Sequence, residues 1–244
     1  MGTTLVVAAA AGCASNFPGP LSSATSCVDP NGMAIKPVAI GMPTSGALVT
    51  SAVVVPAAGT VVAAVAEYCK VLGSINSVDP ATPKIKFRVN LPSSWNGKAL
   101  MFGGGGYNGV LANGLGNVAA GPTDKPAPLA RGYVTFGSDS GHQANANGSR
   151  DGTFNRNDGA LKNFAADAIK KTLHAAINII QTRYAARVQP TVLTLSLSTE
   201  QLANPMPAVK PATTTTIATS HQLTGCGPCN SIGSASAPAW VRPE

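Results

Sequence analysis

The sequence has little charge and few aromatic residues. Charged residues make up 11% and aromatic residues 5% of its 244 residues. The formal net charge is nevertheless +7, from 17 Lys and Arg against 10 Asp and Glu. These cations are scattered along the chain, and Lys170-Lys171 is the only adjacent pair. Because nucleic-acid-binding proteins gather their cations into a patch or stripe, we expect no nucleic-acid partner.

Long apolar runs are also missing, because none approaches the roughly 18 residues of a membrane span. The first residues do contain a short apolar stretch, 5–11, followed by small residues, as in a secretory signal. The letters "AAGC" at 10–13 are also similar to a bacterial lipobox, in which Cys13 would carry the lipid anchor. A start codon assigned inside a longer signal is the alternative. In each case we expect export, as a periplasmic, outer-membrane lipoprotein or secreted protein.

Cysteine is scarce, with five residues in all: Cys13, Cys27, Cys69, Cys226 and Cys229. If Cys13 is lipidated, an even number remains, which suits an oxidising compartment. A bond between Cys27 and Cys69 would close a loop of about 40 residues and stabilise the fold by about 3–4 kcal/mol. Cys226 and Cys229 have CxxC spacing, but no helix pattern follows them, and only His221 lies nearby. We therefore expect neither a redox motif nor a metal site there.

Composition divides the chain into three parts. Residues 1–26 combine the signal-like segment with a tether rich in Pro and Ser, and 27–187 contain most of the periodic patterns. Residues 188–244 are rich in Ser, Thr and Pro and have little charge, so they are expected to be a low-complexity tail.

Short patterns in the central part predict an α/β fold. The apolar runs at 34–40, 46–55 and 60–68 predict antiparallel strands, and 84–92 alternate with Ile85, Phe87 and Val89 on one face. The continuous apolar runs 99–102 and 133–136 predict strands that are covered on both faces. Apolar residues then recur at helical spacing and predict a long amphipathic helix over 159–184.

Several linked motifs resemble the tannase and feruloyl esterase family of α/β-hydrolases. They are "LPSSWNG" at 91–97, "GGGGYNG" at 103–109, "LARGY" at 129–133 and "DSGH" at 139–142. The resemblance covers about 27–184 and includes an early cysteine pair, which implies a disulfide between Cys27 and Cys69. It also implies the N-terminal portion of an α/β-hydrolase fold, with an incomplete sheet and a tail outside the family. No cofactor is expected, because the lid that often carries a calcium site in the family is absent from this sequence.

The glycine run then has a chemical interpretation. Ester hydrolysis passes through an oxyanion, which backbone N–H groups can hold, and glycine lets the backbone approach closely. The resemblance assigns this donor role to Gly106, with Gly105 and Tyr107 supporting the loop. A tight turn without a ligand is the simpler alternative. A phosphate-binding loop is disfavoured, because the run is neither GxGxxG opening a helix nor GxxxxGK[ST].

Ser138, Asp139 and His142 of "GSDSGH" suggest a triad but lie too close together in sequence. We expect Asp139 and His142 to hold the site loop, and not to form a triad with Ser138. His174 lies among apolar residues of the predicted helix and is expected to be structural.

The nucleophile is missing from the pattern. No G-x-S-x-G occurs in 185–244, and Ser196, Ser198 and Thr199 have no glycine beside them, as an elbow serine requires. Either the reading frame shifts near 187–190, or this is a divergent homologue with a non-catalytic tail.

The resemblance implies a serine carboxylic-ester hydrolase for small aromatic esters, in a copy that lacks its nucleophile. The alternative from another class is a secreted, non-enzymatic β-rich binding module with a tail rich in Thr and Pro. The antiparallel strands at 34–90 and the sparse charge are its support.

Overall fold

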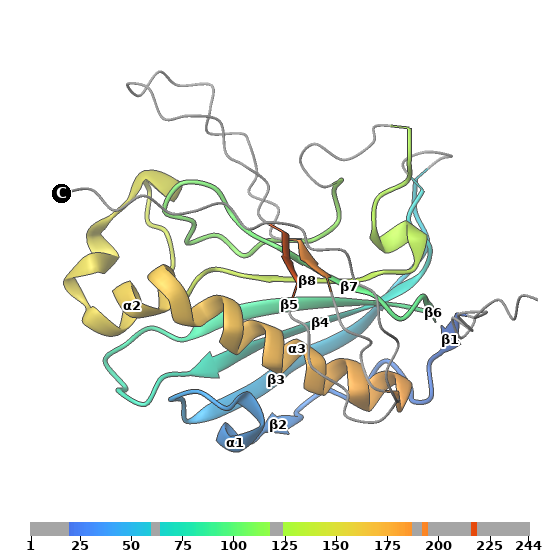
Figure 1. Ribbon diagram of the computed structural model, residues 1–244, viewed down its shortest axis with the longest axis horizontal. Coiled ribbons are helices and arrows are strands. Elements are labelled where there is room, and N and C mark those ends of the chain that lie inside the picture. Colours follow the sequence, from blue (N-terminus) through green and yellow to red (C-terminus); the bar gives the residue numbers. More distant parts are fainter. Residues whose placement is uncertain (1–19, 60–63, 118–123, 187–191, 195–215, 219–244) are drawn as a thin grey trace, which may run out of the picture.

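The computed structural model describes residues 20–59, 64–117, 124–186, 192–194 and 216–218. Its centre is a six-stranded sheet, with one long helical segment lying across a face of that sheet (Figure 1). The strand order is β2-β3-β4-β5-β8-β7. In chain order these strands are β2 (Ala34–Ile35), β3 (Gly46–Val55), β4 (Tyr68–Asn76), β5 (Ile85–Pro92), β7 (Ala99–Phe102) and β8 (Val134–Ser138).

The sheet is mixed. Strands β2 to β5 pair with their neighbours in antiparallel order, and β5 pairs antiparallel with β8. Strand β7, in contrast, runs parallel to β8, with Ala99 opposite Val134 and Phe102 opposite Gly137. The carboxyl ends of β7 and β8 therefore meet at the same edge of the sheet.

Smaller elements surround this sheet. Strand β1 (Leu21–Ser22) pairs with β6 (Ser94–Trp95), and β9 (Val192–Thr194) pairs with β10 (Thr216–Ala218). Strand β9 also lies next to β7, at the edge of the six-stranded sheet. The short helical turns are η2 (Leu129–Arg131), η3 (Gly148–Arg150) and η4 (Thr153–Arg156).

One helical segment runs from 158 to 184 and confirms the helix predicted for 159–184. It consists of α2 (Asp158–Lys162), a π-helical turn η5 (Asn163–Asp167) and α3 (Ala168–Tyr184). Asn157 caps its start, because its side-chain oxygen accepts a hydrogen bond from the Ala160 amide at 2.9 Å. The π-turn has no signal in the apolar periodicity, and the sequence did not predict it.

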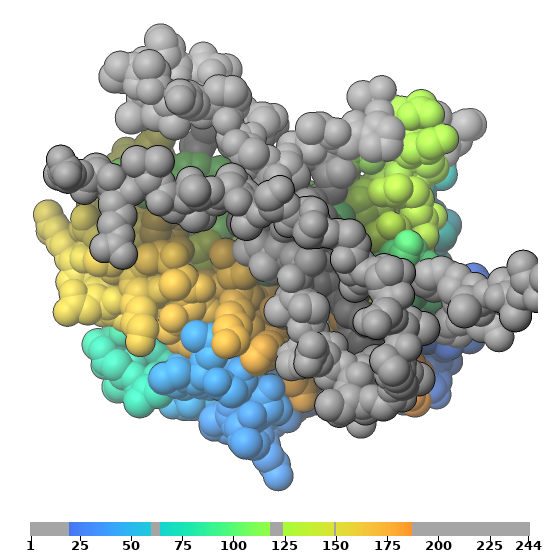
Figure 2. All heavy atoms as spheres, in the orientation of Figure 1, coloured from blue at the N-terminus to red at the C-terminus, as the bar shows by residue number. Residues whose placement is uncertain are grey.

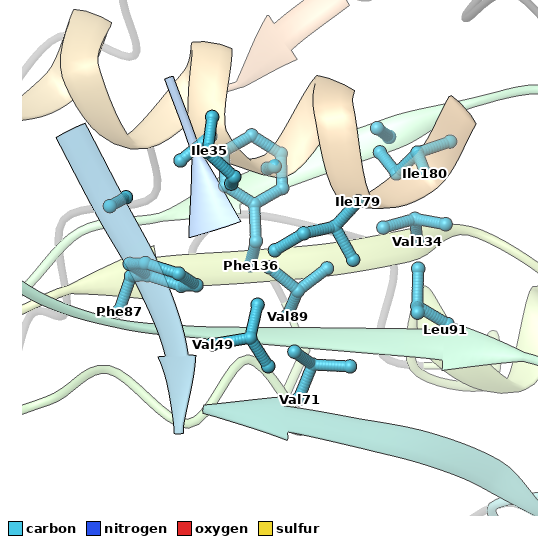
Figure 3. Close-up of a cluster of buried hydrophobic side chains, with 14 of the residues drawn as sticks. Ile35, Val49, Val71, Phe87, Val89, Leu91, Val134, Phe136, Ile179 and Ile180 are labelled. Atoms are coloured by element: carbon cyan, nitrogen blue, oxygen red, sulfur yellow. The ribbon is translucent and has the colours of Figure 1, made fainter. Parts of the chain in front are cut away.

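The main core lies between this helix and one face of the sheet. Ile179 and Ile180 of α3 pack toward Val89, Val134 and Phe136 from the strands (Figure 3). All five side chains are at most 1% exposed. Helix α1 (Pro37–Ile40) lies beside α3, and the two form adjoining parts of the surface in Figure 2.

A loop covers the opposite face at the centre of the sheet. The side-chain Nδ2 of Asn90 donates hydrogen bonds to Thr135 Oγ1 and to the Asn113 carbonyl, both at 2.9 Å. Gly137 lies against Ala112, so that no space remains for a side chain there. The alternating pattern of β5 therefore ends at Asn90, which is fully buried although it lies on the face opposite Ile85, Phe87 and Val89.

The strand predicted for 34–40 is largely wrong. Strand β2 covers only Ala34–Ile35, and Pro37 then begins helix α1. Proline has no N–H to donate to a sheet and fits the first turn of a helix, which explains the change. The strand predicted for 46–55 is confirmed as β3, whereas of the run at 60–68 only Tyr68 belongs to a strand and 60–63 lie outside the described residues.

A disulfide joins Cys27 to Cys69 of β4, with the two Cα atoms 5.5 Å apart and the two residues 42 positions apart in sequence. For a loop of this length the chain-entropy estimate of its contribution is about 4 kcal/mol. The bond therefore fastens the segment that precedes β2 to the middle of the sheet.

Candidate active site

Two loops meet where β7 and β8 end. Because these strands are parallel neighbours, the glycine run after β7 and residues 139–144 after β8 leave the sheet at the same edge. The Ala144 amide donates a hydrogen bond to the Gly109 carbonyl at 2.9 Å and joins the two loops. Carboxyl ends of parallel strands are frequent ligand sites in α/β proteins.

The glycine run folds into a tight turn. The Asn108 amide donates a hydrogen bond to the Gly105 carbonyl at 2.9 Å, and Gly106 inside the turn has a φ of 56°. A side chain would strain the backbone at such an angle, so glycine suits this position. Gly106 is exposed, and its N–H and those of Gly105 and Tyr107 donate to no acceptor within the described part of the chain. Within the described residues, three consecutive amides thus have no acceptor.

Asn108 fixes this turn to the loop after β8. Its Nδ2 donates a hydrogen bond to Ser140 Oγ at 2.7 Å and a second to the Ser138 carbonyl at 3.3 Å. The residue itself has a φ of 58°, a conformation that Asn tolerates better than most residues. Gly104 packs so closely on the side-chain amide of Asn108 that a Cβ atom at position 104 would overlap that group. Gly104 therefore leaves room for the Asn108 side chain. We call its two hydrogen bonds to Ser138 and Ser140 the Asn108 clamp.

Asp139 organises the loop after β8 and is only 1% exposed. Its Oδ1 accepts hydrogen bonds from the amides of Lys86 and Gly141, both at 3.0 Å, and its Oδ2 accepts one from Gln143 Nε2 at 2.7 Å. Burial raises the pKa of this carboxyl, while the three hydrogen bonds and the Lys86 charge oppose the rise. These contacts involve neither His142 nor the Ser138 hydroxyl, so the three residues do not form a triad.

His142 is 2% exposed and forms the base of an aromatic cluster. Its ring stacks on Phe154 with centroids 3.8 Å apart, and the Phe164 ring meets it edge-on at 5.8 Å. Burial lowers the pKa of His142, and the nearby Tyr107 backbone and the Asp151 charge partly offset this. The Tyr107 backbone approaches the imidazole but falls short of hydrogen-bond geometry, so neither ring nitrogen has a partner among the described residues. The lowered pKa favours the neutral imidazole, which packs within the loop, and no serine hydroxyl of the described residues forms a hydrogen bond with it.

The π-turn of the helix supports the same loop from below. A Cβ atom on Gly141 would lie 2.7 Å from Asn163 Cβ, so the loop and the helix are in close contact. Lys171 Nζ donates a hydrogen bond to Asn163 Oδ1 at 3.0 Å and lies 3.4 Å from Asp167 Oδ2. This buried polar group holds Asn163 in place, and π-turns of this kind are frequent at functional sites.

The sequence motifs identified the residues of the two loops but not most of the residues that hold those loops in place. Asn108, Phe154, Asn163 and Lys171 are all part of the arrangement, and only Asn108 had a local signal, since it precedes a glycine within the turn. His174 lies elsewhere: its Nδ1 makes a short hydrogen bond with the Ile40 carbonyl between α3 and α1.

Several residues considered from the sequence lie outside the described residues: Cys13, Ser196, Ser198, Thr199, His221, Cys226 and Cys229. Among the described residues there is no group of three or more His, Cys, Asp or Glu that could hold a metal ion. No helix in the described part is long and apolar enough to cross a bilayer.

A hollow of approximately 400 Å³ lies away from this arrangement. Residues 57–59 and 64–66, with Pro126 and Ala130, line it. Among the described residues its lining includes no ionisable side chain and none of the residues named from the sequence.

The sequence profile described as "Tannase and feruloyl esterase" matches residues 69–192, which include both loops and the helix. The chain belongs to this family. It is 43% identical over 175 residues to an uncharacterised esterase of Agrobacterium fabrum, which covers 70% of this chain. It is also 36% identical over 92 residues to the mono(2-hydroxyethyl) terephthalate hydrolase of Piscinibacter sakaiensis.

This tannase-family chain spans only part of those relatives. The matched stretches cover 30% of the Agrobacterium esterase and 15% of the Piscinibacter hydrolase. Among solved structures, feruloyl esterase B from Aspergillus oryzae matches with a TM-score of 0.48 and 18% identity, covering 64% of this chain and 30% of that one. Tannin acyl hydrolase from Aspergillus niger matches with a TM-score of 0.40 and 14% identity, covering 73% and 33% respectively.

Proposed function

We propose that this chain supplies the oxyanion-binding part of a serine carboxylic-ester hydrolase for esters of aromatic acids. Family membership supports the esterase chemistry. The named substrate of the Piscinibacter relative, a terephthalate ester, and the feruloyl esters in the family description support aromatic acids. In this proposal the described sheet is the N-terminal portion of an α/β-hydrolase fold.

The single observation that carries the proposal is the amide of Gly106, which donates to no acceptor among the described residues. Attack on an ester carbonyl turns its oxygen into an anion, and a preset N–H donor can stabilise that charge by about 3–4 kcal/mol. Gly106 lies in the loop after β7, and in α/β-hydrolases a loop that follows one strand of the sheet supplies one such donor. The Asn108 clamp keeps the amide oriented before the ester arrives, so no reorganisation is needed during the reaction.

The remaining chemistry follows the usual serine pathway. A serine attacks the carbonyl, a histidine takes its proton, and an aspartate orients the histidine while an acyl-enzyme forms. We assign none of these three roles to a residue of this chain, because the elbow pattern is absent from 185–244. A shift of the reading frame near 187–190 would explain this, and the other two frames of the source DNA should then encode a G-x-S-x-G segment.

We also propose that the protein works outside the cytoplasm. The disulfide between Cys27 and Cys69 supports export, because such bonds persist mainly in oxidising compartments. Lipidation of Cys13 is part of this proposal, and mass spectrometry of the purified N-terminus from cells would detect the lipid.

The test of the oxyanion role uses the full chain and methylphosphonate, a tetrahedral anion of the same shape as the reaction intermediate. In two-dimensional NMR, addition of methylphosphonate should shift the amide resonances of Gly106 and Tyr107. The amide of Gly116, a glycine of the same loop with open space around it, is the internal control. Unchanged Gly106 and Tyr107 resonances at saturating anion would contradict the proposal.

A second measurement addresses the nucleophile and the rival function. A serine-directed fluorophosphonate should leave the full chain unlabelled. A stoichiometric adduct on one serine would place the nucleophile in this chain and overturn the proposed absence. Specific glycan binding, without any response of Gly106 to methylphosphonate, would instead support the non-enzymatic binding module.

A further inference from the structure

Tyr107 is exposed and yet firmly held. The residue directly follows Gly106 in the turn, and its side chain is 48% exposed. Its ring meets Phe154 and Phe164 edge-on, in both cases with centroids 6.1 Å apart. Edge-to-face pairs of this kind are favourable, so the Tyr107 ring has a defined position at the surface.

The rings behind Tyr107 form a continuous support. Phe154 and Phe164 lie 5.0 Å apart at 60°, and Phe154 stacks on the buried His142. Both phenylalanines are themselves only half-buried. Together Tyr107, Phe154 and Phe164 make an apolar wall, which we name the aromatic wall, beside the glycine turn.

Such a wall is unusual in a chain with so few aromatic residues. The sequence has six Phe, four Tyr and two Trp. Trp95, Phe87 and Phe136 are at most 1% exposed and serve the core, whereas the aromatic wall remains partly open to solvent. Neither the sheet nor the helix requires an exposed ring at position 107, which points to a ligand.

We propose that the aromatic wall is the subsite for the ring of the acyl group. This inference rests on the proposed function and adds a place for the ring. Consecutive Cα atoms are about 3.8 Å apart, so the Tyr107 ring begins one residue from the Gly106 amide. In an ester of an aromatic acid the ring lies only a few bonds from the carbonyl carbon. An ester whose carbonyl oxygen meets Gly106 can therefore lay its ring on Tyr107. A rigid tyrosine loses little conformational freedom when it binds such a ring.

The aromatic wall should distinguish acyl groups by their shape and polarisability, because stacking on an aromatic ring requires a flat partner. Aromatic pairs gain about 0.5–1.5 kcal/mol beyond the burial of their area. An aliphatic ester of similar size would gain only the burial, so the aromatic wall favours aromatic over aliphatic acyl groups.

The test measures binding to the full chain, using methyl 4-hydroxycinnamate as the aromatic ester and methyl hexanoate as its ring-free counterpart. Ligand-observed NMR titration gives the dissociation constants. Tyr107→Leu, which keeps an apolar side chain but removes the ring, should weaken binding of the cinnamate ester about tenfold. Tyr107→Phe should retain the affinity, and methyl hexanoate should bind the native and Leu proteins alike.

Tyr133→Leu is the matched control. Tyr133 directly precedes β8, with Lys98 Nζ 5.8 Å and Arg131 Cζ 5.2 Å from its ring centroid, away from the glycine turn. Its replacement should leave the cinnamate affinity unchanged. Equal affinity of native and Tyr107→Leu proteins for the cinnamate ester would overturn the subsite, and so would an equal loss for methyl hexanoate.

The experiments distinguish a failure of the oxyanion role of Gly106 from a failure of the subsite at Tyr107. If methylphosphonate shifts the Gly106 amide but Tyr107→Leu leaves cinnamate binding intact, the oxyanion role stands and the subsite falls. If cinnamate binding depends on the Tyr107 ring but Gly106 ignores methylphosphonate, the subsite stands as a binding surface and the oxyanion role falls.

Discussion

Asn108 Nδ2 donates a hydrogen bond to Ser140 Oγ at 2.7 Å, and this contact joins the glycine turn after β7 to the loop after β8. The two residues are 32 positions apart in sequence. Their contact exists because β7 and β8 are parallel neighbours and end at the same edge of the sheet. The proposed oxyanion donor is thus held from outside its own loop.

Two substitutions of Asn108 should separate the contribution of its side-chain hydrogen bonds from that of its backbone conformation. Asn108→Gly keeps the positive φ and removes both side-chain hydrogen bonds, so the free energy of unfolding should fall by about 1–3 kcal/mol. Asn108→Ala should cost about 1 kcal/mol more, because alanine tolerates that φ poorly. Urea denaturation of the three proteins measures both differences. A Gly variant as stable as the native chain would show that the clamp contributes nothing.

Gly104 should tolerate no side chain. Its Cβ would overlap the Asn108 amide, so Gly104→Ala must displace the clamp, and we expect a loss of about 1–3 kcal/mol. Gly116→Ala is the control, since no atom lies within 4 Å of a Cβ there. Thermal unfolding of both variants makes the comparison, and equal melting temperatures would contradict the close packing at Gly104.

Stability should depend on pH through His142. Burial holds its pKa below its ordinary value of 6.5, so the unfolded chain binds the proton more readily than the folded one. The stabilisation is complete above pH 6.5 and is lost progressively as the pH falls toward the lowered pKa. Urea denaturation between pH 7.5 and pH 5 should therefore show a smaller loss for His142→Asn than for the native chain. Parallel curves would mean that the imidazole is not in a desolvated site.

The buried ion pair of the helix should behave as a unit. The side chains of Lys171 and Asp167 are 7% and 10% exposed. Lys171→Met would leave the carboxylate with only the exposed Lys162, whose Nζ lies 3.8 Å from Asp167 Oδ2, and should cost up to about 3 kcal/mol. Adding Asp167→Leu should restore most of that loss. Lys170→Met, at the exposed neighbouring position, is the matched control and should change stability by less than about 0.5 kcal/mol. A double variant no better than the single one would refute the pairing.

The sequence predicted the elements whose cause is local. Apolar spacing predicted the helix over 159–184, and the structure shows that Asn157 caps its start. Pro37 shows a limit of this approach, since a run of apolar residues predicted a strand where proline instead begins a helix. The π-turn was invisible, because the contacts of Asn163 and Lys171 that define it are absent from the apolar pattern.

By itself, the sequence determined the motifs of the family and the glycine run, because both consist of residues adjacent in the chain. The tertiary structure alone decided which distant side chains support the Gly106 amide. Asn108 meets Ser140, and Tyr107 meets Phe154 and Phe164, only because two parallel strands end together and a helix passes beneath them.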